Sequence, residues 1–181
     1  MKITETHIKG LYILEPKIFK DERGCFYETF NSKQFIRNNL SYFFVQDNEA
    51  ESKFGVIRGL HYQHSTMAQA KLVRVTFGEA LDVVVDLRKG SPTFKSVFSI
   101  ILSNENKKQL LIPRGFAHGY SVLSPSCLFQ YKCDNYYAVS HEAGINPLDM
   151  SLSIDWKISE QDRIISSKDA NLPFFNNARL D

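Results

Sequence analysis

Short runs of β-branched and aromatic residues recur about every ten positions along this chain, and this repeat limits the possible folds more than any other feature. The runs occupy residues 11–16, 25–30, 42–46, 56–63, 71–77, 80–87, 96–102, 108–113, 119–123 and 128–133. Strands of this length and spacing are typical of an antiparallel sandwich or barrel. Helix signals are few, at residues 32–39 behind a Ser32 cap and in the tail at residues 159–169. We therefore predict an all-β barrel with a few short helices, forming a single domain over residues 1–181.

Two of these runs, KLVRVTF and ALDVVVDL, are separated only by the short segment Gly78-Glu79. Glycine adopts the positive φ values that tight turns need without a steric penalty. The two runs are therefore predicted to form a β-hairpin.

The composition argues against several classes of partner. The formal net charge of +2 over 181 residues predicts no general affinity for nucleic acid or for an acidic membrane. No apolar stretch is long enough to span a membrane, and the first ten residues lack the apolar core of a signal peptide, so we expect a cytoplasmic protein. Three cysteines at distant positions suit reduced thiols better than a disulfide framework.

Strand alternation predicts where polar side chains point, because residues i and i+2 share a face. Ionisable side chains on four separate runs are in phase with apolar neighbours and are expected to face inward: Glu28, His61, Lys71 and Tyr131. A single inward histidine or tyrosine is usually a hydrogen-bonded core group, whereas a buried lysine ammonium needs a partner or a wet cavity. Together they predict a polar pocket inside the barrel.

Arg58 is out of phase with His61 if the strand between them is regular. A β-bulge at Gly59 would turn both side chains toward the same cavity. This bulge is our hypothesis for the segment RGLH.

A metal site is the first chemical alternative. The segment Pro113-Arg-Gly-Phe-Ala-His118 has the Pro-x-Gly-x-x-His form of the second half-motif of cupin barrels. Metal-binding cupins supply a His-x-His pair and a glutamate from the first half-motif, but the corresponding region here offers only His61. His64 falls on the opposite face of a regular strand. With the ligand set incomplete, we expect a cupin-like barrel without a metal.

The remaining inventory suits proton transfer. No nucleophile elbow, GxGxxG or Walker loop is present. Histidine is a base near neutral pH, tyrosine is a weak acid, and lysine can stabilise an oxyanion. This set suits proton abstraction next to a carbonyl, an enolate, and reprotonation from the other face. Such an epimerisation or isomerisation needs no cofactor.

Several longer segments resemble one known family. They are FKDERGCFYETF, FVQDN, GVIRGLHYQ, AQAKLVRVTFGEALDVVVDLRKGSPTF, LSNENKKQLLIPRGFAHGYSVLS, YKCDNYY and SSKDANLP, in order over nearly the whole chain. They resemble the dTDP-4-dehydrorhamnose 3,5-epimerase family. The resemblance implies a cupin-type barrel in a homodimer, with strands contributed across the interface. It also implies conversion of a dTDP-linked 4-keto-6-deoxy sugar, dTDP-4-dehydro-6-deoxy-D-glucose, into dTDP-4-dehydro-L-rhamnose by inversion at C3 and C5.

Carried over motif by motif, the resemblance implies a catalytic set. His61 of RGLHYQ is the general base, and Asp169 of SSKD pairs with it. Tyr131 is the proton donor and Lys71 steadies the enolate. The residues implied in substrate binding are Phe19, Arg23, Glu28, Gln46, Asp47, Asn48, Arg58, Lys71, His118, Glu142 and Lys168. Two of these are arginines, whose forked donors suit a diphosphate. Phe19 and the NYY segment offer surfaces for the thymine and the sugar.

The chain departs from the family pattern in the segment GINPLDMSLSIDW, and Lys157 replaces the proline that usually follows its tryptophan. These changes precede Asp169 in the chain and bear on the position of its side chain. One alternative function is a single-site epimerase acting at C3 or C5 of a related sugar nucleotide. The 3,4-ketoisomerases of the wider fold lack this His-Tyr-Lys arrangement. A non-catalytic sugar-binding cupin is the other alternative, but it would not need both His61 and Tyr131.

Overall fold

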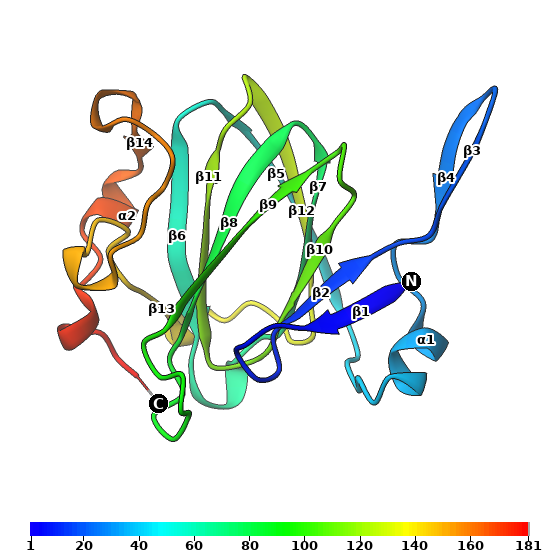
Figure 1. The fold of residues 1–181 in the computed structure, drawn as a ribbon. Coiled ribbons are helices and arrows are strands. Elements are labelled where there is room, and N and C mark those ends of the chain that lie inside the picture. Colours follow the sequence, from blue (N-terminus) through cyan, green and yellow to red (C-terminus); the bar gives the residue numbers. More distant parts are fainter. Residues whose placement is uncertain (181) are drawn as a thin grey trace.

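The computed structural model describes residues 1–180, which form a β-barrel of two facing sheets (Figure 1). The first sheet contains, in spatial order, β1 (Lys2–Glu5), β2 (Tyr12–Glu15), β10 (Gln109–Ile112), β7 (Lys71–Phe77), β12 (Ser126–Cys133) and β5 (Gln46–Lys53). The second contains β13 (Glu142–Gly144), β6 (Val56–Gln63), β11 (Phe116–Val122), β8 (Glu79–Asp86) and β9 (Val97–Ser103), with β14 (Ile164–Ile165) beside β6.

The remaining elements are short. They comprise the separate strand pair β3 (Ile18–Asp21) and β4 (Gly24–Tyr27), helices α1 (Ser32–Arg37) and α2 (Ser167–Ala170), and 3₁₀ turns at Ser65–Met67, Val139–His141, Met150–Leu152, Glu160–Asp162 and Phe175–Asn177. Among the residues described, every strand pair is antiparallel except β14 with β6. This arrangement confirms the predicted all-β, cupin-type jelly roll with few helices.

The space between the sheets is apolar over most of its depth. Alternate residues of facing strands point into it, including Val73 and Val75 of β7, Val84 of β8 and Phe129 of β12, all buried. Burial of this apolar area is the main stabilising contribution to the fold. The polar pocket described below opens at one end of this core.

The predicted hairpin between KLVRVTF and ALDVVVDL is wrong. Gly78 does adopt a positive φ of 78°, but β7 pairs with β10 and β12, whereas β8 pairs with β9 and β11. The turn therefore carries the chain from one sheet to the other. Its amides are held by loop side chains, since Gly78 donates to Asn104 Oδ1 and Glu79 donates to Ser124 Oγ.

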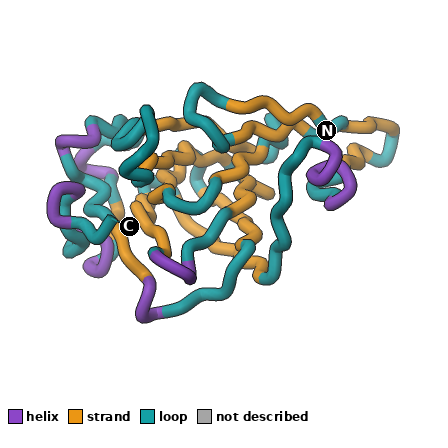
Figure 2. Tube along the Cα trace, turned by 90° about the horizontal axis from the view of Figure 1, so that it is seen from below, coloured by secondary structure: helices purple, strands orange, loops and turns teal. Residues whose placement is uncertain are grey.

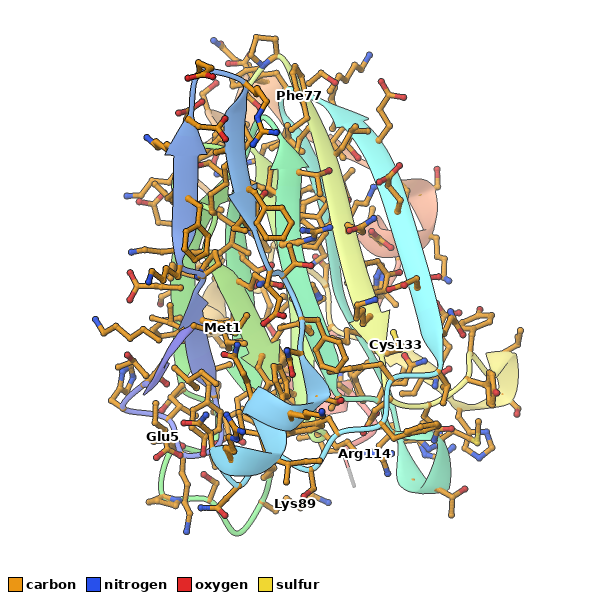
Figure 3. All side chains as sticks on the ribbon, turned by 90° about the vertical axis from the view of Figure 1, so that its right-hand side faces the viewer. Met1, Glu5, Phe77, Lys89, Arg114 and Cys133 are labelled. Carbon is orange, nitrogen blue, oxygen red and sulfur yellow. The ribbon has the colours of Figure 1, made fainter. Side chains whose placement is uncertain are left out.

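The aromatic run at residues 42–46 is not a strand over most of its length. Strand β5 begins at Gln46 and continues through the polar stretch to Lys53. The preceding aromatic side chains Tyr42 and Phe44 instead pack with Phe35 of α1 against the outer face of the first sheet. Helix α1 lies over that face in Figure 3. Its cap is Asn31 rather than Ser32, because the Asn31 side chain accepts from Lys33 N and Gln34 N.

The hairpin formed by β3 and β4 extends away from the barrel (Figure 1). The expectation that Glu28 faces inward is wrong, because this hairpin has no core on either face. Glu28 is exposed and accepts hydrogen bonds from Asn31 and Gln34, while Phe26 is 70% exposed. Strand alternation predicts which side chains of CFYETF share a face. It does not predict whether that face packs against a sheet.

The C-terminal segment covers the outer face of the second sheet. Trp156 and Phe175 pack there against Ile57, Leu81 and Val83 in a second apolar cluster. Figure 2 shows the short helical turns of this segment gathered on one side of the barrel, opposite α1. The segment also brings α2 beside β6, where Asp169 accepts a hydrogen bond from Gly59 N. Within residues 1–180, no helix has the length and apolar character that crossing a membrane requires.

Candidate active site

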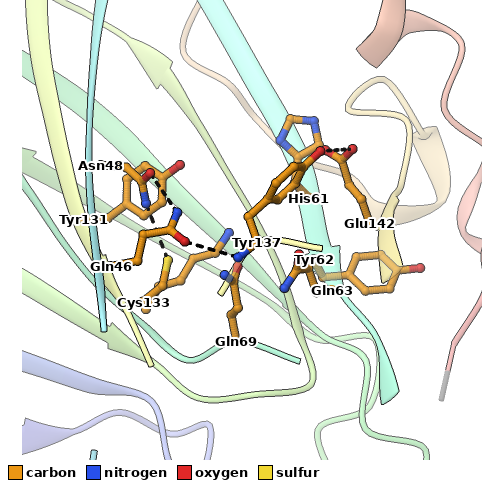
Figure 4. Close-up of a pocket in the computed structure, with 11 residues that line it drawn as sticks. Gln46, Asn48, His61, Tyr62, Gln63, Gln69, Tyr131, Cys133, Tyr137 and Glu142 are labelled. Carbon is orange, nitrogen blue, oxygen red and sulfur yellow. Dashed lines mark hydrogen bonds between the residues drawn. The ribbon is translucent and has the colours of Figure 1, made fainter. Parts of the chain in front are cut away.

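A polar pocket of about 250 Å³ lies between the two sheets (Figure 4). Its walls are formed by Gln46, Asn48, His61, Tyr62, Gln63, Gln69, Lys71, Tyr131, Cys133, Tyr137 and Glu142. The predicted inward orientation of His61, Lys71 and Tyr131 is therefore confirmed. The pocket is smaller than the roughly 300–1,000 Å³ typical of ligand clefts, so a nucleotide sugar would extend beyond it.

His61 forms one wall and is held by a carboxylate behind it. Asp169 Oδ1 lies 2.8 Å from His61 Nε2, and Asp169 Oδ2 accepts from Gly59 N at 3.1 Å. Burial opposes ionisation of Asp169, but hydrogen bonds from His61, Gly59 and Ser166 outweigh it and keep the pKa of this carboxyl below its usual value. A carboxylate that accepts the Nε2 proton leaves Nδ1 as the basic nitrogen of the ring.

Helix α2 positions Asp169 despite the divergent segment that precedes it. The Ser166 side chain caps α2 by accepting from Asp169 N at 3.1 Å. Lys157 adopts a left-handed φ of 59° and pairs with Asp155 at the surface. The change from proline to Lys157 is therefore accommodated outside the pocket.

The β-bulge expected at Gly59 is present. Pairing of β6 with β11 shifts register between His118, opposite His61, and Tyr120, opposite Arg58. One extra residue on β6 places Arg58 and His61 on the same face. Gly59 has a φ of 120°, and a Cβ there would lie 2.6 Å from Gly119 Cα. Only glycine fits this close approach of the two strands.

The opposite wall carries Tyr131 and Lys71. Tyr131 on β12 is directly opposite Val73 of β7, and Lys71 Nζ lies 5.6 Å from the centre of the Tyr131 ring. Burial raises the pKa of the Tyr131 hydroxyl, an effect reinforced by Cys133 and opposed by Arg58. Tyr131 is thus kept protonated, as a proton donor must be.

Lys71 presents a poorly hydrated ammonium to the pocket. Burial lowers the pKa of Lys71, while the nearby Cys133, Asp82 and Glu142 oppose that shift. In the part of the chain that the structure describes, Lys71 Nζ has no carboxylate within the 4.0 Å of an ion pair. Such a cation is available to an anionic oxygen on a ligand.

The rim of the pocket is a hydrogen-bonded chain. Lys168 Nζ donates to Glu142 Oε1 at 2.6 Å, and Tyr137 donates to Glu142 Oε2 at 3.0 Å. Burial opposes ionisation of Glu142, but these bonds outweigh it and lower its pKa. Both Glu142 and Lys168, predicted from the resemblance, thus lie at the site.

The other residues predicted to bind the substrate differ in whether they reach the pocket. Gln46 and Asn48 line the pocket, and Arg58 faces the same side of β6 as His61, with its Nε donating to Ser52 Oγ. Asp47 instead points outward and pairs with Lys132 at 2.8 Å. Three predicted ligand contacts lie on or near the projecting hairpin and do not line the pocket of their own chain: Phe19, Arg23 and Glu28.

Sequence reasoning missed several side chains of the site. Gln69 is in phase with Lys71, and Gln63 is in phase with His61, so the same alternation could have found both. Gln63 donates to Tyr136 O and accepts from Ala138 N, which fixes the loop that carries Tyr137 over the pocket. Tyr137 belongs to the NYY segment, which the resemblance implies as a surface for the thymine and the sugar, and it lines the pocket.

No group of three histidine, cysteine, aspartate or glutamate side chains converges as a metal site would require, among the residues that the structure describes. His64 lies outside the pocket, next to His141. The absence of a metal requirement stays a prediction for experiment.

The chain matches the family model described as dTDP-4-dehydrorhamnose 3,5-epimerase over residues 5–177. It is 49% identical over 174 residues to the Shigella flexneri protein named dTDP-4-dehydrorhamnose 3,5-epimerase, covering 94% of each chain. The crystal structure of the enzyme of that name from Elizabethkingia anophelis superimposes with a TM-score of 0.94 at 50% identity, covering 98% of this chain and 97% of the other.

A second solved structure carries a ligand. It is the dTDP-6-deoxy-D-glucose-3,5-epimerase of Legionella pneumophila in complex with dTDP-4-keto-L-rhamnose, with a TM-score of 0.92 and 50% identity. The match covers 97% of this chain and 93% of the Legionella pneumophila chain. The family match and these full-length similarities agree with the pocket's proton-handling residues. The chain therefore belongs to the dTDP-4-dehydrorhamnose 3,5-epimerase family.

Proposed function

We propose that this protein converts dTDP-4-dehydro-6-deoxy-D-glucose into dTDP-4-dehydro-L-rhamnose by inverting C3 and C5, without a cofactor. The observation that carries the proposal is the placement of His61 and Tyr131 on opposite walls of one pocket (Figure 4). Inversion of a carbon requires that a proton leave one face of the sugar and return to the other. A base from the second sheet and an acid from the first sheet meet that requirement.

The first step is proton abstraction by His61. The C3 and C5 protons are acidic because each carbon adjoins the C4 carbonyl. Transfer of a proton to His61 Nδ1 leaves the electron pair in an enolate, whose negative charge resides on the C4 oxygen. Asp169 accepts from the ring and stabilises the imidazolium that results. The Lys71 ammonium stabilises the enolate oxygen.

The second step is protonation from the other side. Tyr131 donates its proton to the carbon, and the enolate collapses to the ketone with inverted configuration. His61 then gives its proton to water and Tyr131 takes one up from water, which restores both residues, and repeating the two steps at the second carbon completes the reaction. General acid–base catalysis of this kind contributes about 10²–10⁴-fold to the rate.

The dTDP portion is proposed to lie at the pocket mouth, beside Gln46, Asn48 and Arg58. Completion of that subsite by a second copy in a homodimer would explain the hairpin β3–β4. This hairpin carries Phe19, 52% exposed, and Arg23 away from their own barrel. An extended pair of strands with exposed aromatic side chains is suited to packing against another molecule.

The test is incubation of the protein with the 4-keto sugar nucleotide in D₂O, followed by proton NMR. Loss of the C3 and C5 proton signals together with the L-rhamno configuration supports the proposal. Exchange at one carbon alone would identify a single-site epimerase. Binding without exchange at either carbon would indicate a non-catalytic sugar-binding barrel and reject the proposal.

A further inference from the structure

A second histidine–aspartate pair lies deeper in the barrel. Asp82 is on β8, whose inward-facing residues also include Ala80 and Val84. Its carboxylate is wholly buried, with 0% exposure. Burying a carboxylate among apolar side chains is costly unless hydrogen bonds replace its water.

The partner of Asp82 is His118 on β11. Asp82 Oδ2 lies 2.8 Å from His118 Nε2, the same contact that Asp169 makes with His61. His118 is directly opposite His61 across the β6–β11 pair, so both rings project from the same face of the second sheet. The two rings are therefore held by separate carboxylates, one from β8 and one from α2.

The Asp82–His118 pair is poorly arranged for stability alone. Within residues 1–180, Asp82 Oδ1 is one of two buried side-chain atoms without a hydrogen-bond partner, and the other is the Tyr120 hydroxyl. Tyr120 is directly opposite Asp82 on the neighbouring strand. Replacing such a buried pair with apolar residues of similar volume is often neutral or stabilising. The carboxylate is thus better explained by what it does to His118.

We propose that Asp82 is a positioning residue that fixes His118 in the tautomer with its proton on Nε2. The carboxylate accepts that proton in a hydrogen bond and holds the ring against rotation. Nδ1 is then the ring nitrogen left to accept a hydrogen bond from a sugar hydroxyl. This inference rests on the proposed function and on the sugar contact that the family resemblance implies for His118, which is buried and is not among the residues that line the pocket.

Other titratable groups face the same interior. They are His61 on β6, Lys71 on β7, Tyr120 on β11, and Tyr131 and Cys133 on β12. Asp82 is near enough to Lys71 to oppose the lowering of its pKa. An effect of Asp82 through Lys71 must therefore be separated from its effect through His118. A double-variant cycle makes that separation.

The experiment compares Asp82→Asn, His118→Asn and the double variant in the D₂O assay. Loss of the partner that orients a metal-ligating histidine costs about 10–100-fold, and we take that range as the guide here. We expect Asp82→Asn to lower kcat by that order and the double variant to match His118→Asn alone. Asp82→Ser, which fits the same space, serves if the asparagine variant does not fold. Multiplicative effects of the two changes, or a wild-type kcat for the Asp82 variant, would overturn the inference.

A spectroscopic readout excludes a purely structural role. In ¹⁵N-histidine-labelled wild type, His118 should show a protonated Nε2 and a bare Nδ1, and Asp82→Asn should mix the two tautomers. An Nδ1–H tautomer in the wild type, or no change in the variant, would contradict the proposal.

Asp149→Asn is the matched control, since Asp149 is also buried but accepts from Ser151 N and Phe175 N, away from the pocket. It should lower stability and leave kcat and the His118 signals unchanged, and a loss of kcat there equal to that of Asp82→Asn would contradict the specific role. If wild-type protein shows no exchange, the proposed function fails instead, while the tautomer measurement still tests Asp82.

Discussion

At the scale of single residues, the contrast between His61 and Asp169 is the main chemical feature of the protein. The His61 side chain is 33% exposed and the Asp169 side chain only 5%. The imidazole can therefore reach a substrate, while the carboxylate that orients it is shielded from water and from salt. Shielding strengthens the hydrogen bond between them, because the local dielectric is low.

Lys71 is expected to increase activity while lowering the stability of the fold. Its pKa is lower in the folded chain than in the unfolded chain, so protonation destabilises the fold at every pH below the ordinary lysine value. Lys71→Met removes that penalty and should raise the melting temperature. The same change should lower kcat by about 10²–10³-fold or more, because the enolate loses its cation. Calorimetry and the exchange assay on one preparation measure both effects. A melting temperature that falls with activity would show that Lys71 is structural.

The pH dependence of activity should also depend on the protonation of Lys71. The rate requires a protonated Lys71, so it should fall as pH rises through a value below the ordinary 10.5 of lysine. Tyr131 does not lose its proton first, because burial raises its pKa. Lys71→Arg keeps a cation that does not deprotonate, and should retain partial activity with the alkaline fall moved to higher pH. A fall at the same pH in wild type and Lys71→Arg would assign it to another group.

At the scale of elements, the bulge in β6 decides which side chains enter the site. Gly59→Ala should destabilise the protein by at least about 1–3 kcal/mol, because its φ suits only glycine and its Cβ would meet β11. Gly24→Ala is a matched control, since Gly24 has a similar φ of 129° with nothing within 4 Å. Urea unfolding should therefore show a larger loss for Gly59→Ala. Equal losses would mean that the close approach to Gly119 is unimportant.

Strand alternation predicts part of this site and fails elsewhere for a definite reason. It placed His61, Lys71 and Tyr131 on one interior because each strand packs one face on the core. It failed for Glu28, and the short Gly78-Glu79 connection likewise failed to predict the pairing of β7 and β8, since the partner of a strand is set by contacts far away in sequence. Asp82 is equally in phase with the core residues Ala80 and Val84, but a single aspartate in a valine-rich strand does not by itself predict a role at the site. Its role depends on His118, from a strand that follows much later in the chain.

At the scale of the whole molecule, the projecting hairpin predicts that active sites are shared between two copies. Light scattering should give a dimer mass. His61→Asn and Arg23→Ala, each impaired as a homodimer, should regain activity when the chains are co-refolded. One site of the heterodimer then combines an intact His61 with an intact hairpin from the partner. If both residues served the same chain's site, mixing would restore nothing, and a monomer mass would exclude sharing altogether.

The proposed reaction depends most on His61, the base that removes both protons. Its most direct test is proton NMR of the 4-keto sugar nucleotide in D₂O with wild type, His61→Asn and Tyr131→Phe. We predict that His61→Asn suppresses exchange at C3 and C5 alike, by about 10²–10⁴-fold or more. Tyr131→Phe should slow inversion, most plainly at C5, yet leave some exchange, because His61 can still abstract and return a proton. Exchange at the wild-type rate in His61→Asn would show that another group is the base.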